Sequence, residues 1–378
     1  MGWGVSSRPI DPPTLALPHQ GGGNAASRQM SDLMRTLVAT FPAQWRDAMS
    51  LSADLSLPRS YRKADHLIVA GMGGSGMGGD LLRDLLRDDA RGPIIVNRSY
   101  DLPGWVDAST LVCAVSYSGN TEETLSVYRL AKARHAKMCC VTSGGRLAAL
   151  AKKDGVPLVM IPSGYPPRAA LSYTFLPLVR IALLAGWDDS LWRQAEETSR
   201  RLVQWSSSHE RGATGRLMTQ WAKEWAGAPV LLVVPEDRRS PGFRWKNQLN
   251  ENAKMLAYVV TLPEMDHNEV VGWGQPVQGH AKRWAQLSLR DRHDDRRMTK
   301  RFEVTQALWK RAKGKYFDVW AEGTSRMARF ISHVHFGDWM SVYMAEQQHV
   351  KAMPVLPIDW LKKEMRPKRP SRPVRPVK

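Results

Sequence analysis

The sequence has few cysteines, few acidic side chains and no long apolar run. Only 3 of its 378 residues are cysteine. That number is too small for a disulfide framework, and the spacing matches no zinc-binding pattern. No stretch of about 18 or more apolar residues occurs, which excludes a membrane-spanning helix. Asp and Glu number 36 against 54 Lys and Arg, and the formal net charge is +18. The three shortages favour a cytoplasmic protein with reduced, buried thiols that meets an anionic partner.

Part of the positive charge lies in the C-terminal tail. Residues 366–378 read RPKRPSRPVRPVK and contain six basic residues and no acid. Four prolines exclude a helix or a central strand, so we expect a disordered basic tail. Weak binding of a polyanion or partner by this tail stays open, but no long basic stripe interleaved with aromatics accompanies it. Nucleic-acid binding therefore rests on the tail alone.

The N-terminal 29 residues also differ from the rest. They are rich in Pro and Gly and have no basic segment followed by an apolar one, so they do not resemble a secretory signal. We expect residues 1–29 to be disordered or to result from an upstream start-codon assignment. Helical spacing of apolar residues begins after Met30.

Short apolar runs alternate with helical patterns along most of the chain. Between residues 65 and 180 the runs are HLIVA, PIIVN, TLVCAV, KMCCVT and VPLVM. The second half repeats the pattern more loosely with PVLLVVP, AYVVTLP, AQLSLRD and FDVWAEG, after a helical connector over residues 182–224. Strands separated by helices of about 10–15 residues predict parallel sheets of βαβ units. Runs without alternation predict strands buried on both faces.

A glycine-rich segment, GMGGSGMGGD at residues 71–80, follows the first strand and opens a helix. Backbone amides of such a loop and the helix N-terminus favour an anion, to which Ser75 can add a hydroxyl. The segment also matches the dinucleotide pattern GxGxxG at Gly71, Gly73 and Gly76. That interpretation needs an acid at the end of the second strand, which reads NRS at 97–99 with Asp101 following. This motif alone leaves both ligands open.

A second loop, SYSGNTEET, places three hydroxyls at another strand-to-helix junction: Ser116, Ser118 and Thr121. Three hydroxyls, several amides and a helix N-terminus predict a cradle for one phosphate. The alternative is that Ser118 or Asn120 only caps the helix, with an acid completing a capping box. Capping uses one hydroxyl, so phosphate binding is favoured. Both loops would face one crevice at the carboxyl edge of the sheet.

These motifs, with PPRAAL at residues 166–171, resemble the sugar isomerase (SIS) fold. The closer resemblance is to the bacterial and archaeal bifunctional phosphoglucose/phosphomannose isomerase family, and it runs from about Met30 to Lys363. Further similar segments are NQLNENAK, MDHNEVVGW, KRFEVT, AEGTSRMAR and GDWMSVYMA. The resemblance implies an α/β fold of two SIS-type domains, each a doubly wound, flavodoxin-like parallel sheet. It places the first domain, with its leading helix and connector, at 30–205 and the second at 206–365.

The same resemblance implies site residues. Around the sugar phosphate it places Ser75, Ser116, Ser118 and Thr121, with Gly73 and Gly74 in the adjoining loop. Glu251 matches the catalytic base and Arg168 an active-site arginine near C1 and C2 of the sugar. His267, contributed by the neighbouring subunit of a homodimer, and Lys362 match residues that assist ring opening; Lys363 is adjacent, so this position could shift by one. No metal and no nucleotide cofactor are implied.

The residue chemistry agrees with an aldose–ketose isomerase. The resemblance implies glucose 6-phosphate and fructose 6-phosphate as its substrates, with mannose 6-phosphate as a further one. One carboxylate must move a proton between C1 and C2, a cation must stabilise the enediolate, and a histidine suits ring opening near neutral pH. Each residue also has a structural interpretation: a surface carboxylate for Glu251, a turn residue for His267, an anchor for Arg168 and a solvated lysine for Lys362.

Two other functions stay open: a non-catalytic SIS protein that senses sugar phosphates, and another SIS-fold sugar-phosphate enzyme.

One segment departs from the family pattern. Where the family carries an Asp-Pro-Thr-like turn before the terminal helix, this chain reads QHVKAMPVLPIDW. The family resemblance implies that this neighbourhood borders C2, where the glucose and mannose epimers differ.

Overall fold

The computed structural model describes residues 33–274 and 279–365. The predictions for residues 1–29 and for the basic tail 366–378 lie outside these ranges. Helical residues 33–39 and helix α2 (Phe41–Ala53) form the predicted leading helical segment. Its buried face includes Met34, Phe41 and Trp45, which follow the helical spacing expected from the sequence.

The first sheet has five parallel strands in the order β2-β1-β3-β4-β5. Their bounds are β1 His66–Ala70, β2 Ile94–Asn97, β3 Thr110–Val115, β4 Lys137–Thr142 and β5 Leu158–Met160. This order is the flavodoxin-like arrangement of a doubly wound sheet. Helices α4 (Glu122–Ala133) and α5 (Gly145–Asp154) cover one face, where Leu125, Tyr128 and Leu147 pack against Ile68 and Val112.

The second sheet has four parallel strands in the order β7-β6-β8-β9. Their bounds are β6 Val230–Pro235, β7 Ala257–Leu262, β8 Ala285–Arg290 and β9 Lys315–Trp320. The order repeats that of the first four strands of the first sheet, so one arrangement occurs twice in the chain. Helices α10 (Glu269–Trp273) and α11 (Arg296–Arg311) cover the outer face, where Phe302 and Trp309 are buried.

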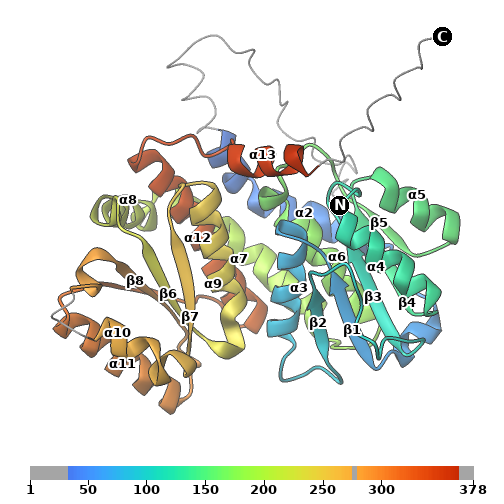
Figure 1. Ribbon diagram of the computed structural model, residues 1–378, viewed down its shortest axis with the longest axis horizontal. Coiled ribbons are helices and arrows are strands. Elements are labelled where there is room, and N and C mark those ends of the chain that lie inside the picture. Colours follow the sequence, from blue (N-terminus) through green and yellow to red (C-terminus); the bar gives the residue numbers. More distant parts are fainter. Residues whose placement is uncertain (1–32, 275–278, 366–378) are drawn as a thin grey trace, which may run out of the picture.

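A layer of helices lies between the two sheets (Figure 1). It contains α3 (Gly74–Leu85), α6 (Leu171–Leu184), α7 (Leu191–Arg211), α9 (Arg239–Glu251) and α12 (Arg326–Gln347), with α8 (Ala213–Trp225) at one end. One continuous apolar core runs from Leu67 and Val69 of the first sheet, through these helices, to Leu232 and Val234 of the second. Both sheets are therefore covered by helices on both faces, which confirms the predicted α/β, doubly wound fold.

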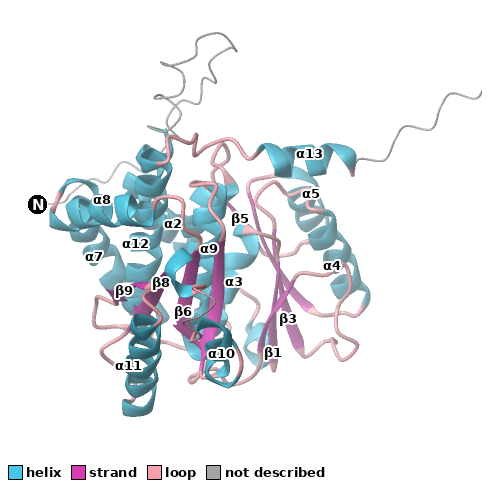
Figure 2. Cartoon of the chain, turned by 60° about the vertical axis from the view of Figure 1, so that its left-hand side comes forward, coloured by secondary structure: helices cyan, strands magenta, loops and turns pink. Residues whose placement is uncertain are grey.

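The predicted elements correspond closely to the observed ones. The strand at 66–70 has the same bounds in both, and the predicted connector over 182–224 is occupied largely by α7 and α8. Helix α13 (Leu356–Glu364) follows α12 and lies across the top of the molecule in Figure 1 and Figure 2. Within the described ranges, no helix combines the length and apolar content needed to cross a bilayer.

Candidate active site

The two predicted anion-binding loops meet at the carboxyl edge of the first sheet. Strands β1 and β3 are neighbours, so the loops that follow them lie side by side. The backbone N–H of Tyr117 donates to Ser75 Oγ at 3.1 Å and joins the loops directly. Helix α3 begins at Gly74 after Gly73, whose φ of +52° belongs to the left-handed region that glycine tolerates. Two helix N-termini therefore point at one small region.

Two of the three hydroxyls of the second loop are bonded to each other. Ser116 is buried, and its Oγ shares a hydrogen bond of 2.8 Å with Thr121 Oγ1. Thr121 is the N-cap residue of α4, yet its side chain makes no capping bond. Ser118 is exposed, and its Oγ accepts from the backbone N–H of Asn120 at 3.3 Å. The capping alternative therefore does not account for the hydroxyls.

Asn120 has a different role. Its Oδ1 accepts from the backbone N–H of Arg146 at 3.1 Å, in the first turn of the neighbouring helix α5. Gly119 packs so tightly on Gly144 that an added Cβ would lie 1.8 Å from the Gly144 carbonyl oxygen. Contacts with α5 therefore fix the backbone of the loop.

The end of β2 bears on the dinucleotide alternative. Arg98 forms an ion pair there with Asp80 of α3, and a Cβ on Gly76 would lie 3.3 Å from Arg98 Nε. A dinucleotide site needs a carboxylate at this position to bind the ribose. The end of β2 therefore carries an ion-paired arginine in place of the carboxylate that a dinucleotide site would need.

Arg168 lies directly against the glycine-rich loop. It belongs to the short 3₁₀ helix Pro167–Ala169, and a Cβ on Gly74 would lie 2.7 Å from the Pro167 carbonyl oxygen. The Arg168 side chain is buried; its Nε donates to Asn252 Oδ1 at 2.8 Å, and its Nη2 donates to the carbonyl oxygens of Ala352 and Met353. Burial lowers the pKa of Arg168, and the charge of Glu251 opposes this shift.

Glu251 faces Arg168 from the last position of α9. Its Oε2 lies 3.6 Å from Arg168 Nη1, and its side chain is 30% exposed. The carboxylate can therefore contact both a buried cation and a ligand that enters from solvent. Pairwise contacts connect these groups: Tyr117 joins the two loops, Gly74 packs on Pro167, and Arg168 pairs with Glu251.

A buried polar network supports this pair from behind. Arg244 of α9 donates through Nε and Nη2 to the two carboxylate oxygens of Asp338 at 2.9 and 2.8 Å. Gln248 donates to the same carboxylate at 3.0 Å, and Arg244 also donates to the Arg168 carbonyl oxygen at 2.6 Å. Because these groups are buried and mutually bonded, they hold the end of α9 and the backbone of Arg168 in one geometry.

Lys254 is a member of the site that the sequence analysis did not single out. It adopts a φ of +56°, and its Nζ donates to the carbonyl oxygens of Glu251, Ala352 and Pro354. Burial, and then the charge of Arg168, lowers its pKa. The only signal in the sequence was its place in NQLNENAK, three residues after Glu251.

The segment that departs from the family pattern is held through its backbone. Both Arg168 and Lys254 bind carbonyl oxygens of residues 352–354, within VKAMPVLP. Backbone acceptors do not depend on side-chain identity, so this anchoring survives the change of sequence.

Lys362 lies on α13, above this site. Asp359, three residues earlier and on the same helical face, raises the pKa of Arg168 through its charge, although burial dominates that group. The Lys362 side chain is exposed. The start of α13 lines a pocket with Glu251 through Pro357 and Ile358, and Lys362 lies about one turn further along the helix.

His267 is the predicted residue that a single chain does not bring to the site. Glu251 precedes the amino end of β7, whereas His267 follows its carboxyl end in the 3₁₀ helix Glu264–His267. Six residues of strand span about 20 Å. His267 is exposed, next to α10 at the opposite end of the molecule from α13 (Figure 1).

The SIS domain model matches residues 60–154, and the model described as the bacterial phospho-glucose isomerase C-terminal SIS domain matches residues 217–365. A bifunctional phosphoglucose/phosphomannose isomerase of Caldicellulosiruptor bescii is 37% identical over 335 residues, which cover 87% of this chain and 97% of that protein. The chain belongs to the bifunctional phosphoglucose/phosphomannose isomerase family. It is an isomerase, and the predicted family is confirmed.

A second relative of the same name agrees with this placement. The enzyme of Thermoplasma volcanium is 32% identical over 325 residues, covering 84% of the present isomerase and 98% of that protein. In fold, the isomerase is similar to the C-terminal domain of a glucosamine-fructose-6-phosphate aminotransferase from Francisella tularensis, with a TM-score of 0.65 and 14% identity over 83% of this chain and 96% of the other. Among the residues that the structure describes, the isomerase has no group of three or more His, Cys, Asp or Glu side chains placed to hold a metal ion.

Proposed function

We propose that this isomerase interconverts glucose 6-phosphate and fructose 6-phosphate, and mannose 6-phosphate through the same enediolate. One observation carries the proposal: a carboxylate, Glu251, lies 3.6 Å from a buried guanidinium, Arg168, whose turn packs on the glycine-rich loop. A base beside a cation is the arrangement that proton transfer next to a carbonyl requires.

The proton transfer can be followed on this chain's own residues. The phosphate occupies the cradle formed by Ser75, Ser116, Ser118 and Thr121. Glu251 removes the C2 proton of the open-chain aldose, and the electron pair forms the C1–C2 double bond and leaves negative charge on O1. Arg168 stabilises that charge. Glu251 then returns the proton to C1 while the O2 proton passes to O1, which yields the ketose.

Mannose 6-phosphate differs from glucose 6-phosphate only in configuration at C2, so removal of its C2 proton yields the same enediolate. The backbone anchoring of residues 352–354 by Arg168 and Lys254 supports a retained C2 environment.

We assign ring opening to Lys362 of the same chain and to His267 of a second copy in a homodimer. The separation of Glu251 and His267 across β7 supports this assignment, because one chain cannot supply both groups to one substrate. A histidine near neutral pH can exchange a proton with the ring oxygen or O1.

Activity assays test the function. Wild-type protein should convert fructose 6-phosphate and mannose 6-phosphate in a coupled assay, with and without EDTA. Glu251→Gln should abolish turnover but keep substrate binding, because the amide cannot take a proton. The matched control is Glu196→Gln, an exposed carboxylate on α7. Near-normal turnover by Glu251→Gln would exclude it as the base, and activity lost on chelation would point to a metal-dependent enzyme.

Mixing inactive variants tests the shared site. Glu251→Gln and His267→Ala should each be inactive alone. After the two are mixed, unfolded and refolded together, half of the dimers are hybrids with one intact site, so about a quarter of the wild-type activity should return. Mixtures that stay inactive would exclude a site built from two copies.

A further inference from the structure

Arg168, the cation of the proposed site, is held by neutral oxygens. Its Nε donates to the amide oxygen of Asn252 at 2.8 Å, and its Nη2 donates to the carbonyl oxygens of Ala352 and Met353 at 2.9 and 2.7 Å. The N–H groups on Nη1 face Glu251 Oε2 at 3.6 Å, which is longer than a hydrogen bond. The side of the guanidinium that faces the carboxylate therefore keeps donors for a ligand.

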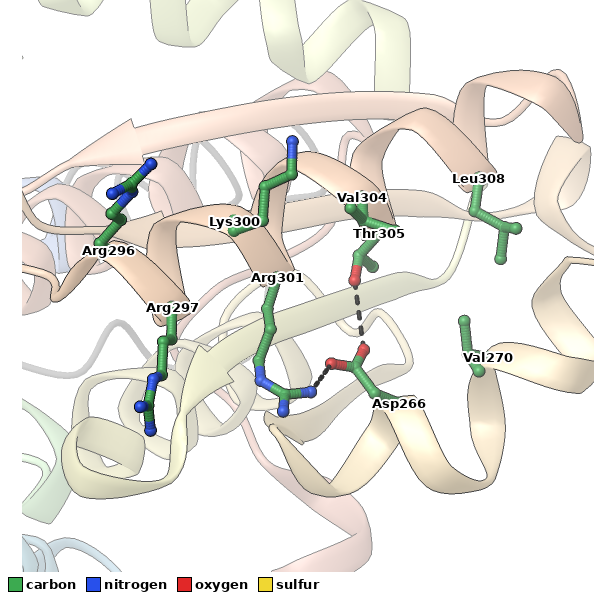
Figure 3. Close-up of a pocket in the computed structure, with 9 residues that line it drawn as sticks. All are labelled: Asp266, Val270, Arg296, Arg297, Lys300, Arg301, Val304, Thr305 and Leu308. Carbon is green, nitrogen blue, oxygen red and sulfur yellow. Dashed lines mark hydrogen bonds and ion pairs between the residues drawn. The ribbon is translucent and has the colours of Figure 1, made fainter.

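Arg244, the neighbouring guanidinium, is held differently. Its Nε and Nη2 donate to both carboxylate oxygens of Asp338, and the two side chains are only 3% and 4% exposed. Arg301 also binds a carboxylate, that of Asp266, at 2.7 Å (Figure 3). A bound carboxylate offsets the charge of a guanidinium, whereas an amide oxygen leaves that charge in place. The chain therefore neutralises Arg244 and leaves Arg168 cationic.

The hydrogen-bond network fixes which end of the Asn252 amide meets Arg168. A guanidinium has donors only, so the atom that accepts from Arg168 Nε is the amide oxygen Oδ1. The amide nitrogen donates to Ser341 Oγ at 3.0 Å, and Ser341 Oγ donates to the Asp338 carbonyl oxygen at 2.7 Å. Asn252 and Ser341 are both fully buried. The position therefore requires one acceptor and one donor on the same side chain, which an amide supplies and a carboxylate does not.

The charge balance around Arg168 changes during the proposed proton transfer. Before transfer, the Glu251 carboxylate is its counter-charge. Once Glu251 has taken the C2 proton it is neutral, and the negative charge lies on the enediolate oxygen. Arg168 then stabilises the enediolate without a competing anion bound to its Nε. Because this gain arises only after the proton has moved, it acts on kcat.

We propose that Asn252 is a positioning residue, which holds Arg168 beside Glu251 through a neutral acceptor and so preserves the charge that stabilises the enediolate. The inference rests on the proposed function for the reaction itself. Asn252 directly follows Glu251 and is the C-cap residue of α9. The end of one helix therefore carries both the base and the group that holds its cation.

Asn252→Asp separates holding from charge. The substitution keeps the size of the side chain and the acceptor for Arg168, but it adds a permanent counter-charge. It should lower kcat by about tenfold or more with a smaller change in KM. It should also move the acid limb of the kcat profile up by about one pH unit, because a second carboxylate beside Glu251 disfavours the charged form of the base. A residue that only anchors Arg168 would leave this limb in place.

The matched control is Asn250→Asp, which adds the same charge next to Glu251. Asn250 is exposed, and its Oδ1 accepts from the backbone N–H of Ala257. Its kcat and acid limb should stay close to those of the wild type. Equal effects of the two substitutions, or no effect of Asn252→Asp, would overturn the proposal. The other charged groups around Glu251 are the same in both variants: Arg168, Arg244, Lys246, Lys254 and Asp359.

Asn252→Ala supplies a second measurement. It removes the acceptor and adds no charge, so kcat should fall by about tenfold while the acid limb stays in place. Thermal melting shows whether each variant folds. If Asn252→Asp does not fold, Asn252→Ala decides the question: a kcat equal to that of the wild type would overturn the proposal.

Ligand binding separates this inference from the proposed function. The probe is arabinonate 5-phosphate, a sugar-acid phosphate whose carboxylate lies where the enediolate charge forms. In calorimetry, wild type and Asn250→Asp should bind it equally, and Asn252→Asp should bind it about tenfold more weakly. This pattern in a protein that is inactive on hexose 6-phosphates would overturn the function and keep the role of Asn252. Equal binding and equal turnover by all three proteins would overturn the inference alone.

Discussion

At the scale of residues, the site depends on side chains whose partners lie far away in the sequence. Ser116 and Thr121 could be predicted as a pair because five positions of one loop separate them, and they share a bond of 2.8 Å. Arg168 and Glu251 could be named only one at a time, since their contact depends on the packing of α9 against the first half of the chain. Lys254 was missed because an exposed-looking lysine gives no sign that its Nζ will bind three carbonyl oxygens.

Removal of both cradle hydroxyls should weaken phosphate binding. The double variant Ser116→Ala, Thr121→Ala should raise KM for fructose 6-phosphate by about thirtyfold or more, because each of the two lost hydrogen bonds to a charged group contributes about 1 kcal/mol or more. We expect a smaller effect on kcat, since the phosphate is remote from C1 and C2. Steady-state kinetics on the purified variant measure both.

A matched control exists elsewhere in the chain. Ser208 and Thr214 form the same hydroxyl pair at 2.8 Å between α7 and α8. Replacement of both by Ala should leave KM unchanged. If the two double variants behave alike, the cradle is not at Ser116 and Thr121.

At the scale of elements, the inner strands could be predicted because they are short, largely apolar runs, and the strand at 66–70 matched to the residue. Strands β8 and β9 carry polar residues such as Gln286 and Asp318, so their pattern is looser. The order of the strands could not, because it depends on which crossover packs on which face of the sheet. The same limit applies to His267: the motif identified the residue, but only the course of β7 shows that it lies at the opposite edge from Glu251. The exposure of α13 could not be predicted either, because apolar residues in a helix normally predict a buried face.

The contact between α3 and the Arg168 turn gives an element-scale prediction. In Gly74→Ala the new Cβ would meet the Pro167 carbonyl oxygen at 2.7 Å, so the turn must shift. Because Arg168 is displaced from Glu251, kcat should fall by about tenfold or more while the fold is retained. Gly104→Ala, where no atom lies within 4 Å, is the control. Unchanged kcat in Gly74→Ala would show that the turn does not position Arg168.

At the scale of the whole molecule, two sheets of the same strand order share one core but differ at their carboxyl edges. The first edge carries glycine and hydroxyl loops. The second edge carries a network of ion pairs. Arg238 lies 3.0 Å from the Asp291 carboxylate, and Arg329 lies 2.8 Å from the same carboxylate. Within the described residues, these charges are paired with one another, so the proposed phosphate cradle lies at the first sheet although the architecture is repeated.

Buried histidines in the central layer make the fold sensitive to acid. His209 of α7 and His335 of α12 face each other, with their Nδ1 atoms 2.9 Å apart. Burial lowers the pKa of His209 to about 4 and that of His335 well below its usual range, and burial also lowers the pKa of His333 to about 4. In the unfolded chain these groups titrate near pH 6.5. Above that pH these histidines are neutral in both states, so they do not make the free energy of unfolding depend on pH. Below it the unfolded chain binds protons that the folded state excludes.

The free energy of unfolding should therefore fall as the pH drops from 6.5 towards 5, by about 1.4 kcal/mol per pH unit for each histidine kept neutral. The free energy of unfolding can be measured by urea denaturation at several pH values across this range. Most carboxylates stay ionised there, because they titrate at about pH 4. In His209→Gln one titrating group is removed. The change of the free energy of unfolding with pH should therefore be smaller by the contribution of about one proton, whatever the effect of the substitution on stability at pH 8. His280→Gln, at an exposed position, should leave the slope as it is. A slope that is the same in all three proteins would mean that the histidine pair accepts protons in the folded state, and the central helices would then have to open at this contact.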